Sequence, residues 1–385
     1  MALYLDYNAT TPLDSEVAET MARCSEAQWG NPHSLHAWGR RARAAVEDAR
    51  EQVADLVGCD RRWITFTSGA TEANNTVLQG WAVADGGQNA LLVGGGEHPS
   101  VRETARALGE RGVRTAEIPV DGNGVVTPEA LAETLATQAP VGLVSVMMAN
   151  NETGAVQPVH ELAAVCAEHG VALHSDAVQA AGRLPLDMAR SGVAAMSLSA
   201  HKIYGPQGVG ALVRDPERLP IAPLLHGGGH ERGRRAGTEN VAGIVGFGVA
   251  ADQARHQRGP EARRLTALRE RLEMGLAESG LAVTIVARGA ERLPNTTCLL
   301  LPGAEAETLL MNLDLEDIAV SSGSACASGS LAPSEALLAM GIPAEQARSA
   351  LRVSLGRPTS GADVDHFVQR LAVVAGRLQK RGAPA

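Results

Sequence analysis

The chain has 385 residues, of which 45% are hydrophobic and only 3% aromatic, and its formal net charge at pH 7 is −9. This length allows one large domain and a smaller one, and the acidic balance argues against a nucleic-acid partner bound by general electrostatics. The longest apolar run, Val241 to Ala251, is interrupted by glycine and is too short for a membrane span. The chain begins without a basic leader, and its five cysteines lack CxxC spacing, so we expect a cytoplasmic protein without disulfides or a metal site.

In chain order, the first clear element is a helix from near Arg40 to Gly58. Apolar residues recur there at spacings of four and three, and the glycine ends the pattern. Seven apolar runs follow as predicted strands, most of them separated by helical stretches: residues 63–67, 90–94, 113–118, 141–148, 171–174, 193–198 and 209–213. Apolar strands that alternate with helices predict an α/β fold, with a mainly parallel sheet covered by helices.

The character of the chain changes after about residue 257, where a charged helix at 263–278 begins a segment of strands and helices. We therefore predict a large domain at 15–256. A smaller α+β domain is predicted from residues 1–14 and 257–385.

Polar residues follow several predicted strands, at the edge where open α/β sheets bind ligands. The turn Ser68 to Glu72 leads into a helix whose first N–H groups could hold a phosphate, although ordinary helix capping explains the same residues. Asp176 could pair with a protonated pyridine nitrogen, with Gln179 near a ring oxygen, or it could be a helix N-cap. Asn151 belongs to a polar turn. His98 could stack on a flat cofactor or move protons, although a lone loop histidine is more often solvated.

The segment SLSAHKIYGP, Ser197 to Pro206, places Lys202 at the end of an apolar strand. An ammonium is costly to bury there, so we expect a lowered pKa and a nucleophilic amine, as a Schiff-base enzyme requires. A surface lysine in a glycine-rich loop is the ordinary alternative. A phosphate-binding turn, the strand-end Asp176 and this lysine together match the requirements of pyridoxal 5′-phosphate (PLP).

The order of these motifs resembles the class V aminotransferase family, in which the lysine segment has the form S-x-H-K, as Ser199 to Lys202 does. The resemblance implies the fold type I of PLP-dependent transferases, with PLP as cofactor.

A second motif is the small, glycine-rich segment SSGSACASGSL at 321–331, which carries Cys326. Little apolar area holds it in place, so we expect residues 323–333 to be a mobile loop that brings the thiol over a cofactor; a free thiol in a linker is the alternative. The remaining cysteines lie in apolar or helical contexts, where we expect no catalytic role: Cys24, Cys59, Cys166 and Cys298.

With LDYNATTP at 5–12, GGGHERGRRAGTEN at 227–240 and LRVSLGRPT at 351–359, the cysteine segment is similar to the NifS/IscS-type cysteine desulfurases over nearly the whole chain. The resemblance implies that L-cysteine is converted to alanine, that Cys326 receives the sulfur as a persulfide, and that Arg352 binds the substrate carboxylate. Any contact of Cys326 with an iron–sulfur cluster would be transient.

The resemblance also implies a role for each remaining site residue. Lys202 would hold PLP covalently, Asp176 would keep its ring nitrogen protonated, and His98 would stack on the ring and relay protons. Gln179 and Asn151 would bind near the ring oxygen and the substrate. The phosphate would be lined by Ala70, Thr71, Ser199 and His201, with Thr238 from the partner subunit of a homodimer.

Three questions stay open at this stage. The sulfur acceptor, for example an iron–sulfur scaffold, is not named by the sequence, and the chain ends sooner than family members with a scaffold-binding tail. Nitrogenase maturation, tRNA thiolation and DNA sulfur modification therefore remain alternatives. A selenocysteine lyase or a kynureninase-like hydrolase would need no loop cysteine. A non-catalytic scaffold protein would be expected to lose Lys202 or Cys326, and the chain keeps both.

Overall fold

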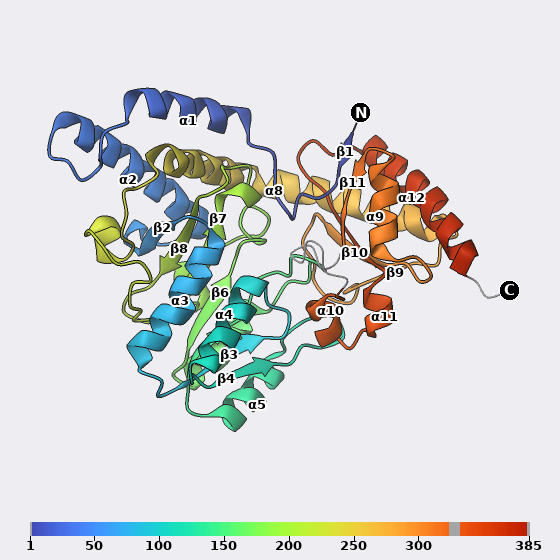
Figure 1. The fold of residues 1–385 in the computed structure, drawn as a ribbon, viewed down its shortest axis with the longest axis horizontal. Coiled ribbons are helices and arrows are strands. Elements are labelled where there is room, and N and C mark those ends of the chain that lie inside the picture. Colours follow the sequence, from blue (N-terminus) through green and yellow to red (C-terminus); the bar gives the residue numbers. More distant parts are fainter. Residues whose placement is uncertain (1, 323–331, 383–385) are drawn as a thin grey trace.

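A computed structural model describes residues 2–322 and 332–382 (Figure 1). The predicted loop at 323–333 therefore lies outside the described residues, except for Ala332 and Pro333. The chain forms a large part around a seven-stranded sheet and a smaller part around a four-stranded sheet, which confirms the α/β class.

The large sheet contains all seven predicted strands. They are β2 (Ile64–Thr67), β3 (Ala90–Gly94), β4 (Thr115–Ile118), β5 (Val141–Ser145), β6 (Ala172–Asp176), β7 (Ala195–Ser199) and β8 (Gly210–Arg214). Their order is β2-β8-β7-β6-β5-β3-β4, and only β8 runs against the others. The connection from β7 to β8, residues 200–209, is too short for a parallel crossover, which needs a dozen or more residues. The chain therefore returns antiparallel, and the sheet is mainly parallel as predicted.

Helices cover both faces of this sheet. The elements are α1 (Ser15–Ala27), α2 (Ala37–Val57), α3 (Ala70–Asp85), α4 (Pro99–Glu110), α5 (Pro128–Gln138), α6 (Val159–Glu168) and α7 (Met188–Ser191), with 3-10 turns η1 (Arg61–Trp63), η2 (Ala200–Lys202) and η3 (His230–Gly233). Leu91 of β3 packs with α3 and α4, whereas the next residue, Leu92, packs with α2, α5 and α6 on the opposite face. Successive side chains of a strand point to opposite faces, so both faces must be apolar and covered. Helix α2 ends as predicted at Gly58, whose φ of 64° suits glycine.

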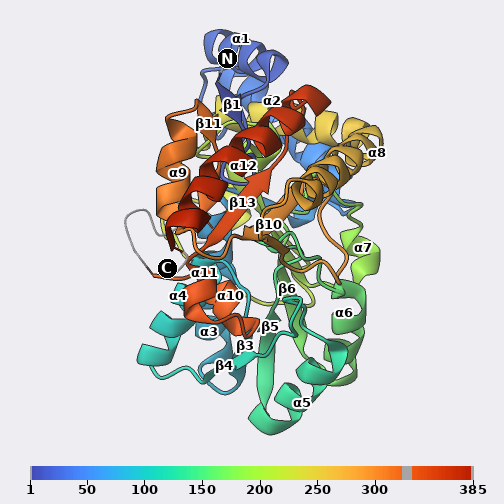
Figure 2. The same ribbon diagram turned by 90° about the vertical axis from the view of Figure 1, so that its right-hand side faces the viewer.

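The smaller part has the predicted α+β character. Its strands are β1 (Leu3–Tyr4), β9 (Thr284–Ile285), β10 (Thr296–Leu300), β11 (Ile318–Ala319), β12 (Ser321–Ser322) and β13 (Ala350–Ser354), and its helices are α9 (Ala306–Asp314), α10 (Glu335–Ala339), α11 (Ala344–Ala347) and α12 (Gly361–Gly382). The four-stranded antiparallel sheet has the order β12-β13-β10-β9, and β1 pairs with β11. Figure 2 shows α9 and α12 beside this sheet, where Leu309 and Phe367 pack against Leu299 and Leu351.

A single helix, α8 (Val241–Glu278), runs through both parts (Figure 1). The sequence pattern predicted a separate helix only at 263–278, but α8 is continuous over 38 residues and contains Pro260. A proline removes one backbone hydrogen bond, and packing along the rest of the helix compensates for it. A Cβ at Gly248 would lie 2.7 Å from the Cα of Ala49, so glycine is needed where α8 crosses α2. The predicted domain boundary falls inside this helix, and the division of the chain stays a prediction.

Among the described residues, no helix combines the length and the apolar character needed to cross a bilayer.

Candidate active site

A cavity of about 520 Å³ lies at the carboxyl ends of β6 and β7, beside the first turn of α3. Ten residues predicted from the sequence line it: Ala70, Thr71, His98, Asn151, Asp176, Gln179, Ser199, His201, Lys202 and Arg352. Nine come from the strand ends, loops and helix starts of the large part, and Arg352 comes from β13 of the small sheet. The cavity thus lies where the two parts of the chain meet.

The first turn of α3 forms one wall of the cavity. Its N-cap, Gly69, makes no side-chain cap hydrogen bond, and a Cβ built on Gly69 would meet nothing within 4 Å. A Cβ on Gly210 would lie 2.6 Å from the Cα of Gly69, so only glycine lets β8 pass beneath this turn. Ala70 and Thr71 are the first two residues of the helix. An uncapped helix start with open space beside it suits an anion such as a phosphate.

Ser199 and His201 line the cavity at the end of β7, and Ser199 pairs with Gly210, next to the start of α3. Burial and the neighbouring Lys202 lower the pKa of His201 to about 4, so the imidazole is neutral near pH 7. Its Nδ1 lies 3.1 Å from Oγ1 of Thr10. A neutral imidazole offers one N–H donor and one acceptor, which suits a hydrogen bond to a phosphate oxygen.

Lys202 occupies the last position of η2, directly after β7. It is one of only two lysines in the chain. Its Nζ donates to the carbonyl oxygens of Asn8, at 2.5 Å, and of Ala9, at 2.6 Å. The amine is therefore held at the cavity wall by the amino-terminal segment of the protein.

Asn8 is a site residue that the sequence reasoning missed. It is 1% exposed, and its Nδ2 donates to Oγ1 of Thr296 in β10, at 2.9 Å. Its carbonyl oxygen also accepts from Nε2 of Gln179, at 3.0 Å. Asn8 thus joins the small sheet to the wall that carries Lys202. The available signal was its place in the LDYNATTP motif.

Gln179 is already bound at both ends of its amide. Besides its bond to Asn8, its Oε1 accepts from Nη1 of Arg183, at 3.0 Å. A hydrogen bond to a cofactor oxygen would have to share or replace one of these bonds, so its predicted role stays a prediction.

Asp176, the last residue of β6, is 6% exposed and belongs to a chain of hydrogen bonds. Nδ2 of Asn74 donates to Oδ2 of Asp176, at 2.7 Å, and to Oγ of Ser100, at 2.8 Å. The backbone N–H of Ser100 in turn donates to Nδ1 of His98, at 3.1 Å. Asn74 and Ser100 were also missed from the sequence. The signal for Asn74 is an amide one turn before the apolar residues Val77 and Leu78, on the same face of the helix.

This network defines the state of His98. Because a backbone N–H donates to Nδ1, the ring is neutral and carries its proton on Nε2. Burial lowers the pKa of His98, although the Asp176 carboxylate acts in the opposite direction. A neutral ring can lie flat against an aromatic cofactor without bringing a second positive charge beside Lys202.

Arg352 is 1% exposed and presents its guanidinium to the cavity. Nη2 donates to Oδ1 of Asp6, at 2.7 Å, and Nη1 donates to the carbonyl oxygen of Asn151, at 3.1 Å. Its buried Nε has no hydrogen-bond partner among the described residues. A guanidinium has five N–H donors, so this side chain retains capacity for an anionic ligand.

Two predicted site residues are not among the lining residues. Cys326 lies outside the described residues. Thr238 is exposed on this chain and does not line the cavity, so its predicted contact with a partner subunit stays a prediction. The other four cysteines do not line the cavity either. Burial raises the pKa of the Cys24 thiol, and it raises the pKa of the thiols of Cys59, Cys166 and Cys298 to about 12. Thiols with such pKa values are poor nucleophiles near neutral pH.

Both flanks of the segment that carries Cys326 lie next to cavity residues. Ser321, in β12, is the cross-strand partner of Arg352. On the other side, Oγ of Ser334 donates to Oε2 of Glu152, the residue after Asn151. Burial raises the pKa of Glu152 to about 7. The segment between these flanks therefore starts and ends beside the cavity.

The aminotransferase class-V family model matches residues 3–367. The chain is 45% identical to cysteine desulfurase IscS of Anaeromyxobacter sp. (strain Fw109-5), over 99% of this chain and 94% of that protein. It is 40% identical to cysteine desulfurase IscS of Dictyoglomus turgidum, over 98% and 95%. A solved NifS-like protein superimposes with a TM-score of 0.91 at 35% identity, covering 98% of this chain and 100% of its own. The chain therefore belongs to the class-V aminotransferase family and, within it, to the cysteine desulfurases.

Proposed function

We propose that this cavity is the active site of a PLP-dependent cysteine desulfurase, in which Cys326 takes the sulfur of L-cysteine. Family membership supports the activity, and the cysteine desulfurases are PLP enzymes. The observation that supports the assignment of Cys326 is the position of the two flanks of its segment: Ser321 pairs with the cavity residue Arg352, and Ser334 bonds to Glu152, the neighbour of the cavity residue Asn151.

The residues present fit PLP. An uncapped helix start with open space beside Gly69 suits the phosphate, with Ala70, Thr71, Ser199 and His201 around it. A carboxylate at the end of β6 suits a protonated ring nitrogen, and a lysine amine lies on the same wall. When bound, PLP supplies an electron sink that weakens the bonds at Cα of an attached amino acid.

The protein side of the chemistry begins with positioning. The amide of Asn74 and the backbone N–H of Val178 both donate to Asp176, so its carboxyl group is held in one orientation. The carbonyl oxygens of Asn8 and Ala9 hold the Lys202 amine, which would bind the cofactor and later accept the substrate's α-proton. His98, neutral and protonated on Nε2, would relay protons.

Substrate recognition would rest on Arg352 and Asn151. The guanidinium of Arg352 would bind the α-carboxylate of L-cysteine, sharing its charge with Asp6. The buried Nε of Arg352 has no hydrogen-bond partner among the described residues, and an unsatisfied buried donor costs free energy. An anion that accepts from this N–H would remove that cost.

Sulfur removal conserves atoms and electrons. The Cys326 thiolate attacks the substrate sulfur, so that an S–S bond forms and the Cβ–S bond breaks. The electron pair of the broken bond takes up a proton and becomes a C–H bond of alanine. L-cysteine and the Cys326 thiol are thus converted to L-alanine and a Cys326 persulfide, whose outer sulfur passes to an acceptor protein. The homodimer, the class of acceptor and the cytoplasmic location remain predictions.

The test is to locate the persulfide. The enzyme would be loaded with sulfur-35-labelled L-cysteine without reductant, alkylated, digested and mapped. We expect the label on the peptide that contains Cys326, and we expect the Cys326→Ser variant to make no alanine while it still changes its absorption on adding L-cysteine. Cys59→Ser serves as the matched control and should keep the parent rate. Label on another cysteine, or alanine formed at the parent rate by Cys326→Ser, would contradict the assignment.

A further inference from the structure

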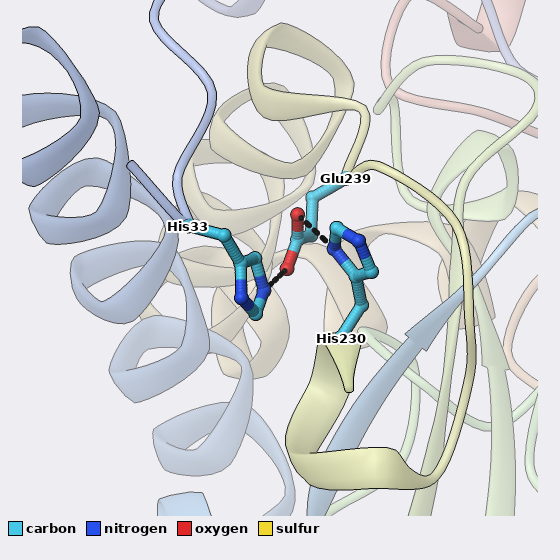
Figure 3. A group of neighbouring side chains, drawn as sticks. All are labelled: His33, His230 and Glu239. Atoms are coloured by element: carbon cyan, nitrogen blue, oxygen red, sulfur yellow. Dashed lines mark hydrogen bonds and ion pairs between the residues drawn. The ribbon is translucent and has the colours of Figure 1, made fainter. Parts of the chain in front are cut away.

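A second cluster of titratable side chains lies outside the cavity, where the loop before α2 meets the segment before α8 (Figure 3). Nε2 of His33 lies 3.0 Å from Oε1 of Glu239, and Nδ1 of His230 lies 3.1 Å from Oε2 of the same carboxylate. The two imidazole rings are 4.1 Å apart between centroids. Figure 3 shows both rings turned toward Glu239 from different segments of the chain.

The carboxylate of Glu239 is buried, with a side chain only 7% exposed. Burial acts to raise the pKa of Glu239, but hydrogen bonds from its own backbone N–H and from His230 and His33 outweigh this effect, and the pKa is lowered. The group is therefore an anion at neutral pH. Among the described residues, no arginine or lysine is paired with it.

The arginines nearest in sequence are committed elsewhere. Arg232 and Arg234 each donate to the carbonyl oxygen of Arg62, and Arg235 pairs with Glu72. The negative charge of Glu239 therefore faces two imidazole nitrogens, with no nearby cation of the same segment to neutralise it. Imidazole nitrogen and carboxylate oxygen are ligands that zinc prefers.

We propose that His33, His230 and Glu239 bind one divalent transition-metal ion of the Zn²⁺ class, with water in the fourth position. The ligand atoms of a tetrahedral zinc ion lie about 3.3 Å apart. With one carboxylate oxygen as the ligand, the three ligand atoms lie within 4.8 Å of one another, so they must draw together by up to about 1.5 Å. The two short distances, 3.0 and 3.1 Å, run to the two different oxygens of Glu239, so each imidazole already faces the carboxylate. Small side-chain rotations of the half-exposed His33 would complete the geometry.

A metal ion binds an imidazole through a ring nitrogen that carries no proton. The nitrogens that face Glu239 would therefore present their lone pairs to the ion, and the ring protons would lie on Nδ1 of His33 and Nε2 of His230. The ion would join the loop before α2, the turn η3 and the start of α8. The site is independent of the proposed activity and departs from the sequence-based expectation of no metal site.

The test uses the PLP-loaded enzyme, treated with EDTA and then titrated with Zn²⁺ against a chromophoric chelator. Co²⁺ serves as a second probe, because a tetrahedral site gives it a strong visible spectrum. Titrations are made in the Cys326→Ser background, so that the loop thiolate is not a ligand. The variants are His33→Ala and Glu239→Gln. The matched control is His256→Ala, because the Nδ1 of His256 lies 3.4 Å from a single carboxylate, that of Asp252.

We expect one equivalent of Zn²⁺ per chain in the background enzyme and in His256→Ala. Loss of a residue that only hydrogen-bonds to a metal ligand weakens metal binding about 10- to 100-fold. Loss of a ligand itself, in His33→Ala or Glu239→Gln, should weaken Zn²⁺ binding at least as much. Metal-free thermal unfolding checks that each variant is folded, and Glu239→Gln preserves the shape of the side chain. If no Zn²⁺ bound, or if the background enzyme and both ligand variants bound it with equal affinity, the proposal would be overturned. The three side chains would then form only a hydrogen-bonded cluster.

Discussion

The amide of Asn74 is the most informative single perturbation of the proposed active site. The residue is fully buried, and its Nδ2 makes one hydrogen bond to the Asp176 carboxylate and one to Ser100. A hydrogen bond to a charged group contributes about 1.5–3 kcal/mol, and a neutral one about 1 kcal/mol. We therefore expect Asn74→Ala to lower the free energy of unfolding by about 2.5–4 kcal/mol.

The same substitution should weaken PLP binding, because Asp176 loses the donor that holds Oδ2 in place. The hydrogen bond from Asn74 to the Asp176 carboxylate contributes about 1.5–3 kcal/mol. If all of this free energy is lost from PLP binding, the dissociation constant of PLP rises about 10- to 150-fold. Urea denaturation of the cofactor-free protein gives the first quantity. Absorbance titration of the same protein with PLP gives the second.

Asn75→Ala is the matched control. Asn75 lies on the same helix, is half-buried and bonds only to neutral groups, such as the carbonyl oxygen of Thr71, at 2.9 Å. Its side chain makes three neutral hydrogen bonds, to Thr71, Gln79 and Thr104, so we expect a loss of about 1–3 kcal/mol in stability and no change in PLP affinity. If Asn74→Ala matched this control in both measurements, Asp176 would not depend on Asn74, and the network argument would be refuted.

The remaining predictions concern the cofactor lysine, a buried histidine and a buried ion pair. Borohydride reduction followed by peptide mapping should attach PLP to Lys202; a mark on Lys380, the only other lysine, would overturn the assignment. Burial lowers the pKa of His174 to about 4, so the unfolded chain binds a proton first and stability should fall by about 3 kcal/mol as pH drops from 6.5 to 4. His174→Gln should flatten this part of the stability–pH curve. An unchanged slope would mean that His174 is not the group whose protonation lowers the stability. Glu231→Gln should cost about 3–5 kcal/mol in urea denaturation, because it removes the buried negative charge 2.7 Å from Arg50 and leaves only Glu47, at 3.1 Å, to pair with that guanidinium; a loss under about 1 kcal/mol would mean that the pair is solvated.

Local patterns in the sequence determined the elements of the large sheet and the types of residue at its edge. A run of apolar residues is a property of neighbouring positions, so the seven strands and the end of α2 at Gly58 could be predicted without tertiary contacts. Lys202 and Asp176 could be found for the same reason, because each lies within four residues of the end of such a run. Cys326 and Arg352 could be assigned only by resemblance of their motifs.

Tertiary structure alone decided which distant residues complete the site. Asn8 reaches Lys202 across 194 positions of sequence, and Asn74 reaches Asp176 across 102. The continuity of α8 through Pro260 was likewise invisible locally, because packing against α1, α2 and α12 offsets the lost hydrogen bond. The periodicity of apolar residues indicates which face of a helix or strand is buried, but it does not indicate which residues pack against that face. The partners of a buried amide or carboxylate are chosen when the sheets and helices assemble, because only then does the cost of leaving a polar group unpaired have to be met by a particular neighbour.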